Sequence, residues 1–116
     1  STWYMTPVKS YADFTALRGM PRVPVNAAAR FSRSAGTGQA RVTLRNPSRS
    51  IAFFLRLQVT GHGGEEALPV LWEDNYVSLL PGETRTVTAT YRLRDLGGGA
   101  PRVVVSGWNV RRTVAR

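Results

Sequence analysis

The side chains able to carry out catalysis are few in this chain. His62 is the single histidine, and the sequence has no cysteine. It sits in the run Gly61-His62-Gly63-Gly64, with no second histidine, cysteine or serine-nucleophile pattern near it. One isolated imidazole can form neither a nucleophilic triad nor a metal site. We therefore expect His62 to be an exposed loop residue, and we expect no metal and no cofactor.

The acidic residues are the other candidates for chemistry, because two facing carboxyl groups can act as general acid and base. There are seven: Asp13, Glu65, Glu66, Glu73, Asp74, Glu83 and Asp95. Glu73 and Asp74 are adjacent, so on an extended chain their side chains point to opposite faces. Glu65 and Glu66 follow a glycine run and belong to a loop. We predict no catalytic residue in this chain.

A binding role has a better case in one segment. Trp72 and Tyr76 could stack on sugar rings, while Glu73, Asp74 and Asn75 could hydrogen bond to hydroxyl groups. Tryptophan and tyrosine in a small domain also serve in the core or at interdomain contacts, and Trp108 is expected in one of those two places. We therefore take residues 72–76 as a candidate contact with either a glycan or a neighbouring domain.

The charge offers an alternative partner. The formal net charge is +9 with a pI near 11.4, and all but Lys9 of the 16 basic residues are arginine. Clustered arginines can bind polyanions such as nucleic acid. Here the polar or outward positions of separate expected strands, which need solvated side chains anyway, hold Arg41, Arg45, Arg56, Arg92 and Arg94. We expect nucleic acid not to be a partner, and we interpret residues 111–116 as a solvated basic tail.

We expect β-strands to position these residues, because apolar and polar residues alternate along most of the sequence. After the turn at Leu80-Pro81-Gly82-Glu83, residues 84–93 alternate between apolar and threonine or arginine side chains. The same period of two predicts strands at 40–45 and 53–60. Further strands are expected at 23–31 (an edge strand, because of Pro24), 68–72, 76–79 and 102–110, with a bulge at Gly107.

Seven short strands separated by turn signals predict an all-β fold, an immunoglobulin-like antiparallel sandwich. The expected core is Val42, Leu44, Phe53, Leu55, Leu57, Val87, Ala89 and Tyr91. We divide the chain into an adapter at 1–21, with a short helix at 11–17, the sandwich at 22–110, and the basic tail. At 116 residues the chain is one domain, and no run reaches membrane-spanning length.

Several runs resemble one family in matching order. They are W-E-D-N-Y-V-S-L at 72–79 with the turn at 80–83, W-Y-M-T-P-V at 3–8, S-Y-A-D-F-T-A-L at 10–17 and S-G-W-N-V at 106–110. Together they resemble the C-terminal immunoglobulin-like domain of family-two glycoside hydrolases of the exo-β-D-glucosaminidase and endo-β-mannosidase type. The resemblance implies a non-catalytic domain that supports a catalytic barrel, with the catalytic carboxylates in that barrel.

The resemblance also implies partners and a setting. The other domains of a parent enzyme would be the main partner, with Trp3, Tyr4, Phe14 and Leu17 as candidate interdomain packing residues. The sequence has neither a starting methionine nor a signal-peptide pattern, so we expect a piece of a longer polypeptide. The resemblance implies that this parent is a secreted or periplasmic bacterial protein. Three alternatives remain: the same domain of a β-mannosidase, a self-standing carbohydrate-binding module, and an arginine-rich polyanion binder.

Overall fold

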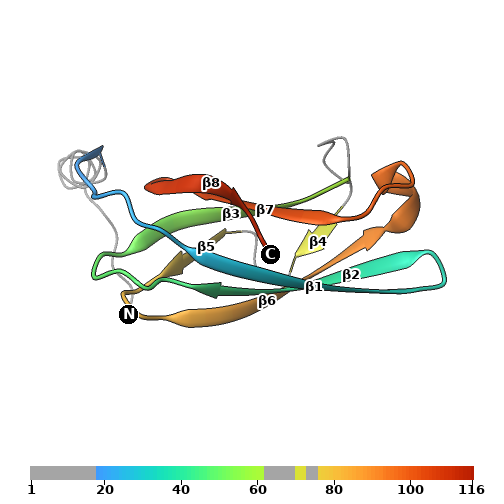
Figure 1. Ribbon diagram of the computed structural model, residues 1–116, viewed down its shortest axis with the longest axis horizontal. Coiled ribbons are helices and arrows are strands. Elements are labelled where there is room, and N and C mark those ends of the chain that lie inside the picture. The colour runs from blue at the N-terminus through green and yellow to red at the C-terminus, as the bar shows by residue number, and fades with distance from the viewer. Residues whose placement is uncertain (1–17, 62–69, 73–75) are drawn as a thin grey trace, which may run out of the picture.

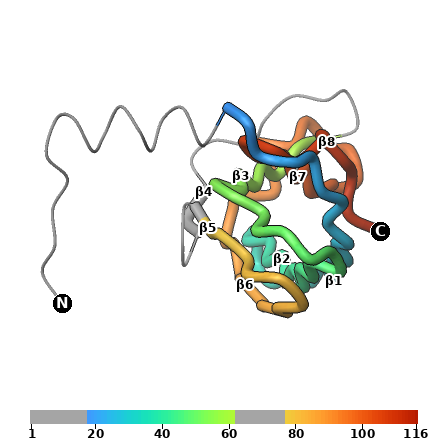
Figure 2. Tube along the Cα trace, turned by 90° about the vertical axis from the view of Figure 1, so that its left-hand side faces the viewer, coloured from blue at the N-terminus to red at the C-terminus, as the bar shows by residue number. Residues whose placement is uncertain are grey.

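Two antiparallel sheets face each other in the computed structural model, which describes residues 18–61, 70–72 and 76–116. The first sheet has the order β1-β2-β6-β4 and the second β5-β3-β7-β8. Figure 1 shows the two layers from the side, and Figure 2 shows them from one end. The strands are β1 (Asn26–Ser34), β2 (Thr37–Arg45), β3 (Ala52–Thr60), β4 (Val70–Trp72), β5 (Tyr76–Leu79), β6 (Thr84–Arg92), β7 (Arg102–Gly107) and β8 (Val110–Val114). A 3-10 helix, η1 (Leu93–Leu96), follows β6.

The core lies between the sheets, where alternation in β2 and β6 places it. Val42 pairs with Val87 and Ala40 with Ala89, and all four side chains are buried. Seven of the eight residues expected in the core are buried: Val42, Leu44, Leu55, Leu57, Val87, Ala89 and Tyr91. The immunoglobulin-like sandwich predicted from the sequence is therefore confirmed.

Phe53 is the exception, and the cause is a bulge in β3. The pairing of β3 with β5 shifts register between Ala52 and Leu55, and Phe54 has a positive φ of 54°. The extra residue lets Ala52 and Leu55 both point inward, so Phe53 is only half-buried. The expectation that Phe53 belongs to the core was wrong, because strict alternation does not allow for a bulge.

The C-terminal residues also differ from the expectation. Residues 102–110 are not one strand, because β7 ends at Gly107 and the chain reverses at Trp108 and Asn109 into β8. Residues 111–116 are therefore not a basic tail, since β8 pairs with β7 along residues 110–114. Arginines on the exposed side of an edge strand look like a solvated tail in the sequence. The bulge expected at Gly107 is confirmed by a register shift between Val105 and Gly107.

The last two residues connect the sheets. The Ala115 N–H donates to the Val103 carbonyl in one sheet, at 2.8 Å. The Ala29 N–H of the other sheet donates to the Arg116 carbonyl at 2.7 Å, and the Arg116 N–H donates to the Ala27 carbonyl at 3.1 Å. The C-terminal segment thus closes the gap between β8 and the edge strand β1.

The N-terminal part begins β1 later than expected, at Asn26 and beyond Pro24. Val23 forms a parallel bridge with Val110, so this segment also crosses between the sheets. The expected helix at 11–17 and the loop residue His62 lie outside the described residues. Within the described ranges, no helix has the length and apolar character to span a bilayer.

Candidate interdomain surface

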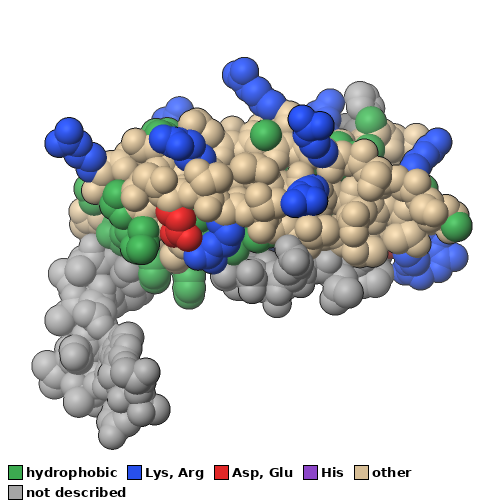
Figure 3. All heavy atoms as spheres, turned by 90° about the horizontal axis from the view of Figure 1, so that it is seen from below, with side chains coloured by type: hydrophobic (Ala, Val, Ile, Leu, Met, Phe, Trp, Pro, Cys, Tyr) green, Lys and Arg blue, Asp and Glu red, His purple; other side chains and the backbone are tan. Residues whose placement is uncertain are grey.

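Exposed apolar side chains gather at the end of the sandwich where β3 begins and the chain turns from β7 into β8. This is the left end of the ribbon in Figure 1. We call this the aromatic end and define it by Phe53, Phe54, Leu80 and Trp108. Phe54 is 54% exposed and Trp108 is 46% exposed, while Leu80 is also exposed. Figure 3 shows hydrophobic side chains gathered at this same end of the visible face. Exposed clusters of this kind in a soluble domain mark interaction surfaces.

The β3 bulge presents the phenylalanines of the aromatic end. The rings of Phe53 and Phe54 stack with centroids 4.7 Å apart and an interplanar angle of 11°. The Phe54 N–H donates to Ser78 Oγ at 3.1 Å, which ties the bulged backbone to β5. A bulge re-aims side chains and is a common device at functional edges. Here it turns two aromatic rings away from the core, toward the end of the sandwich.

Asn109 holds this end together from the β7–β8 turn, and it is buried. Its Oδ1 accepts from the Phe53 N–H at 2.8 Å, and its Nδ2 donates to the carbonyls of Ile51 at 2.8 Å and Pro21 at 2.9 Å. Its own carbonyl accepts from the Val23 N–H at 2.9 Å. The hydrogen bonds of this one side chain therefore link three segments: the N-terminal segment at Pro21, the start of β3, and the β7–β8 turn that contains Trp108.

Asn46 does the same on the other side of β3, and it is fully buried. Its Nδ2 donates to the carbonyls of Ser50 at 2.7 Å and Leu79 at 3.1 Å. Its Oδ1 accepts from the Ser48 N–H at 3.0 Å and from the Ser48 hydroxyl at 2.7 Å. The hydrogen bonds of the two asparagines hold the β2–β3 connection, the end of β5 and the β7–β8 turn together as one rigid unit. This unit carries the side chains of the aromatic end.

Sequence reasoning did not single out Asn46 or Asn109 as organising residues. Asn46 directly follows the strand expected at 40–45, and Asn109 falls within the strand expected at 102–110. A weak signal was available, because asparagine favours turns through hydrogen bonds from its side chain to nearby backbone. Most of the bonds found here instead reach residues more than 30 positions away, and local turn preference cannot predict those partners.

The L-P-G-E turn adjoins this end and behaves as expected. Gly82 has a positive φ of 76°, which the type II turn requires at that position. The Glu83 carboxylate accepts from the Leu80 N–H at 2.8 Å and pairs with the Arg85 guanidinium at 2.8 Å. These contacts, the Leu80 N–H first, hold the pKa of the Glu83 carboxyl below its ordinary value. Glu83 therefore has a structural role in the turn.

The two described residues of the segment at 72–76, which was expected as a glycan or interdomain contact, belong to different sheets. Trp72 ends β4, which pairs with β6, and Tyr76 begins β5, which pairs with β3. Glu73, Asp74 and Asn75 lie outside the described residues, as do Trp3, Tyr4, Phe14 and Leu17, so these site predictions stay predictions. Trp108 is too exposed to be a core residue, and its interdomain role stays open.

The described residues do not bring two carboxyl groups together. Glu83 and Asp95 are the acidic residues within the described ranges, and they flank the two ends of the nine-residue strand β6. Nine residues of strand separate them by about 30 Å. Each is ion-paired, Glu83 with Arg85 and Asp95 with Arg92. Glycoside hydrolysis needs two carboxyls about 5 to 9.5 Å apart. Within the same ranges, no cluster of three or more His, Cys, Asp or Glu side chains could hold a metal ion.

The fold is that of an immunoglobulin-like sandwich domain, and apolar side chains are exposed at one of its ends. The chain belongs to the exo-beta-D-glucosaminidase Ig-fold domain family, whose profile matches residues 3–110. It is 51% identical over 112 residues to the exo-beta-D-glucosaminidase of Streptomyces avermitilis, and 46% identical over 112 residues to that of Amycolatopsis orientalis. These alignments cover 92% and 94% of this chain but 12% and 11% of the relatives.

Two further comparisons extend the likeness. The crystal structure of the Amycolatopsis orientalis exo-chitosanase CsxA matches 99% of this chain and 14% of its own, with a TM-score of 0.85 and 44% identity. A mannosylglycoprotein endo-beta-mannosidase of Lilium longiflorum is 34% identical over 85 residues, which is 66% of this chain and 9% of that protein. The chain thus spans roughly an eighth of the length of the relatives it matches.

Proposed function

We propose that this domain is a non-catalytic part of a larger glycoside hydrolase, in which the aromatic end packs against a neighbouring domain. The proposal rests on the aromatic end, which combines two stacked phenylalanines and an exposed tryptophan. Asn109 holds these residues close to Pro21, where the N-terminal part of the chain enters the sandwich. An interdomain contact covers about 600 to 1,500 Å² and is moderately apolar. Aromatic anchors supported by buried hydrogen bonds suit such a contact.

The parent substrate follows from the relatives as part of the same proposal. We favour a glucosaminide, since the bacterial exo-beta-D-glucosaminidases align over most of this chain at 46% to 51% identity. The endo-beta-mannosidase likeness is shorter and weaker, which makes a mannoside the second choice. A domain with a net charge of +9 would repel a polycation such as chitosan, so we do not assign substrate capture to it.

The setting is proposed on the same grounds. A secreted or periplasmic bacterial parent fits a polysaccharide-degrading enzyme, whose polymeric substrate lies outside the cell. The absence of cysteine is compatible with either compartment, because a sandwich with this core needs no disulfide.

The test uses the longer polypeptide that contains this chain, compared with this chain alone. Amide hydrogen exchange at Phe53, Phe54 and Trp108 is expected to slow at least tenfold in the longer protein. Asn26, exposed on β1 at the edge of the first sheet, serves as a reference site that stays unchanged. Equal exchange in both proteins at the aromatic end, with activity unaffected by Trp108→Ala, would rule out the packing role.

A second candidate, the polyanion binder, has one observation in its favour. Arg30 of β1 lies directly opposite Arg41 of β2, a like-charge pair that costs stability unless an anion is bound. Figure 3 shows several basic side chains spread over the face of the domain seen from below. Heparin binding that weakens steeply with salt and is lost in Arg30→Gln plus Arg41→Gln would support it. Salt-insensitive or absent binding would remove it.

A further inference from the structure

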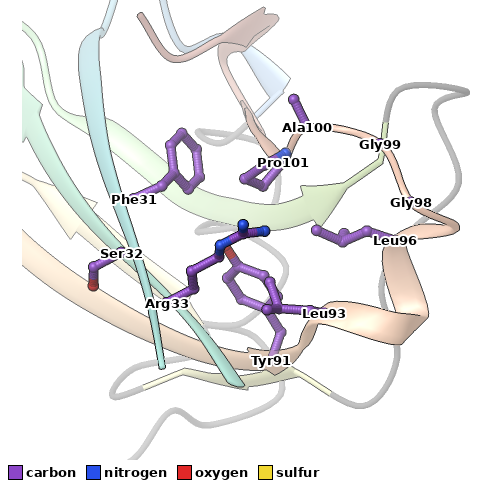
Figure 4. A pocket seen from close by; sticks show the side chains of 10 residues that line it. All are labelled: Phe31, Ser32, Arg33, Tyr91, Leu93, Leu96, Gly98, Gly99, Ala100 and Pro101. Atoms are coloured by element: carbon purple, nitrogen blue, oxygen red, sulfur yellow. The ribbon is translucent and has the colours of Figure 1, made fainter. Parts of the chain in front are cut away.

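A half-open cavity lies at the other end of the sandwich, away from the aromatic end. Its volume is about 520 Å³, within the usual range for small-molecule sites. Figure 4 shows the lining side chains, which come from β1, the end of β6, η1 and the connection to β7. Phe31, Leu93, Leu96 and Pro101 make most of its walls apolar.

Arg33 is unusual because it lies on the inward face of its strand. It pairs with Gly38, whose position is buried, and Phe31 two residues earlier pairs with buried Ala40. In Figure 4 its guanidinium extends into the cavity, whereas the neighbouring Ser32 side chain points away. An inward charge can protect an edge strand from pairing. That role needs no cavity and no second polar group beside the charge.

The second polar group is the Tyr91 hydroxyl, brought there by Gly38. Arg33, Gly38 and Tyr91 form one row across three strands. A Cβ on Gly38 would lie 2.3 Å from the Tyr91 ring and 2.8 Å from its hydroxyl oxygen. The missing side chain therefore lets the tyrosine ring lie over Gly38. Figure 4 shows the Tyr91 side chain reaching toward Arg33.

The Arg33 guanidinium and the Tyr91 hydroxyl can both donate hydrogen bonds. Burial raises the pKa of the Tyr91 phenol, so it stays protonated at neutral pH. Asp95 of η1 is engaged by Arg92. In the part of the chain that the structure describes, no acidic side chain lines the cavity, and neither Arg33 nor Tyr91 has a side-chain hydrogen-bond partner. A guanidinium and a neutral phenol converging over apolar walls select an anion attached to an apolar body.

We propose that this cavity binds a small organic carboxylate, with the carboxylate on Arg33 and Tyr91 and the apolar body against Phe31, Leu93 and Pro101. The lining of this cavity includes none of the residues that define the aromatic end, so the proposal does not rest on the interdomain contact.

The experiment follows backbone amide shifts of this chain during titration with benzoate, and separately with benzyl alcohol and acetate. Benzoate is expected to bind saturably, with a dissociation constant on the order of 1 mM, shifting residues 31–33 and 93–101. Benzyl alcohol lacks the charge and acetate lacks the apolar body, so each is expected to bind at least fivefold more weakly. Equal binding of benzyl alcohol, or no saturable shift with benzoate, would overturn the proposal.

Matched variants separate the site from general positive charge. Arg33→Gln is expected to weaken benzoate at least fivefold, whereas Arg30→Gln, the same charge change on the outward face of β1, should alter it less than twofold. Tyr91→Phe keeps the ring over Gly38 and removes only the hydroxyl, with an expected two- to threefold loss. Equal effects of the two arginine variants would show nonspecific attraction and refute the site. If Arg33→Gln does not fold, Arg33→Lys replaces it as the test. Lysine keeps the positive charge but lacks the bidentate guanidinium, so this variant should bind benzoate more weakly than the native chain.

Discussion

The side-chain oxygen of Asn109 accepts a 2.8 Å hydrogen bond from the Phe53 N–H, which joins the β7–β8 turn to the β3 bulge, 56 residues away in the chain. The Trp108 N–H returns a bond of 3.0 Å to the Phe53 carbonyl. The exposed tryptophan and the bulged phenylalanines are thereby fixed to each other through hydrogen bonds of their backbones. The stability of the domain and the shape of its aromatic end should consequently depend on the same asparagine.

Asn109→Ala is expected to destabilise the chain by about 2 to 4 kcal/mol, because it leaves the Phe53 N–H and two carbonyls without their partner. Urea denaturation measures this. Asn26→Ala, at an exposed position of β1, is the control and should change stability by less than about 0.5 kcal/mol. If the two variants lose similar amounts of unfolding free energy, water replaces the hydrogen bonds of Asn109 without loss of stability, which contradicts the prediction.

Trp108→Ala separates folding from interdomain contact. The side chain is 46% exposed, so its loss should cost the isolated chain less than about 1 kcal/mol. In the longer parent protein, the same change should cost about 2 kcal/mol or more of interdomain binding, as aromatic anchors do. Thermal unfolding of both proteins measures the difference. An equal effect in both would show that Trp108 serves only this domain.

Leu55→Ala tests the register of the core. Leu55 is fully buried between the sheets, and truncation should cost about 2 to 5 kcal/mol. Gln39→Ala, at an exposed position of β2, should be nearly neutral. Denaturation curves with unchanged slope provide the values. Strong protection of Thr86 and its outward neighbours, with a small Leu55 effect, would contradict the observed register.

Glu83→Gln should alter the pH dependence of stability. The Leu80 N–H and Arg85 lower the pKa of the folded carboxyl, so this group stabilises the fold at pH values above its unfolded pKa of about 4.3. That contribution is lost as the pH falls through the lowered folded value. Thermal unfolding from pH 7 to pH 2 should show a smaller acid destabilisation in the variant than in the native chain. Parallel curves would indicate that the carboxylate is not stabilised by the turn.

The isolated chain should not hydrolyse 4-nitrophenyl β-D-glucosaminide or the matching β-mannoside. Glu83 and Asp95 stand at opposite ends of β6, too far apart to act on one bond. Release of nitrophenol by purified chain is the measurement, with a glycosidase as positive control. Turnover abolished by Glu73→Gln or Asp74→Asn would overturn the accessory role.

Much of the fold was predictable because alternation is a local property. The runs at 40–45 and 84–93 specify an inward and an outward face by themselves, and their buried residues were found correctly. The bulge at Phe53 was not predictable, since an extra residue is tolerated only where the partner strand and the Asn109 bond accommodate it. The strand at 110–114 was missed because the adjacent Arg111 and Arg112 break the apolar–polar alternation and resemble a solvated tail.

The sequence by itself determined the sandwich, the positions of most strands, the type II turn at Gly82, and the family through runs that extend over most of the chain. Tertiary structure alone decided which polar residues became structural and which aromatic residues became exposed. Asn46 and Asn109 bond to backbone groups of several chain segments, and Arg33 meets Tyr91 only because Gly38 lies between them in the sheet. These relationships depend on register across strands, and register is set by packing of the whole fold rather than by any one segment.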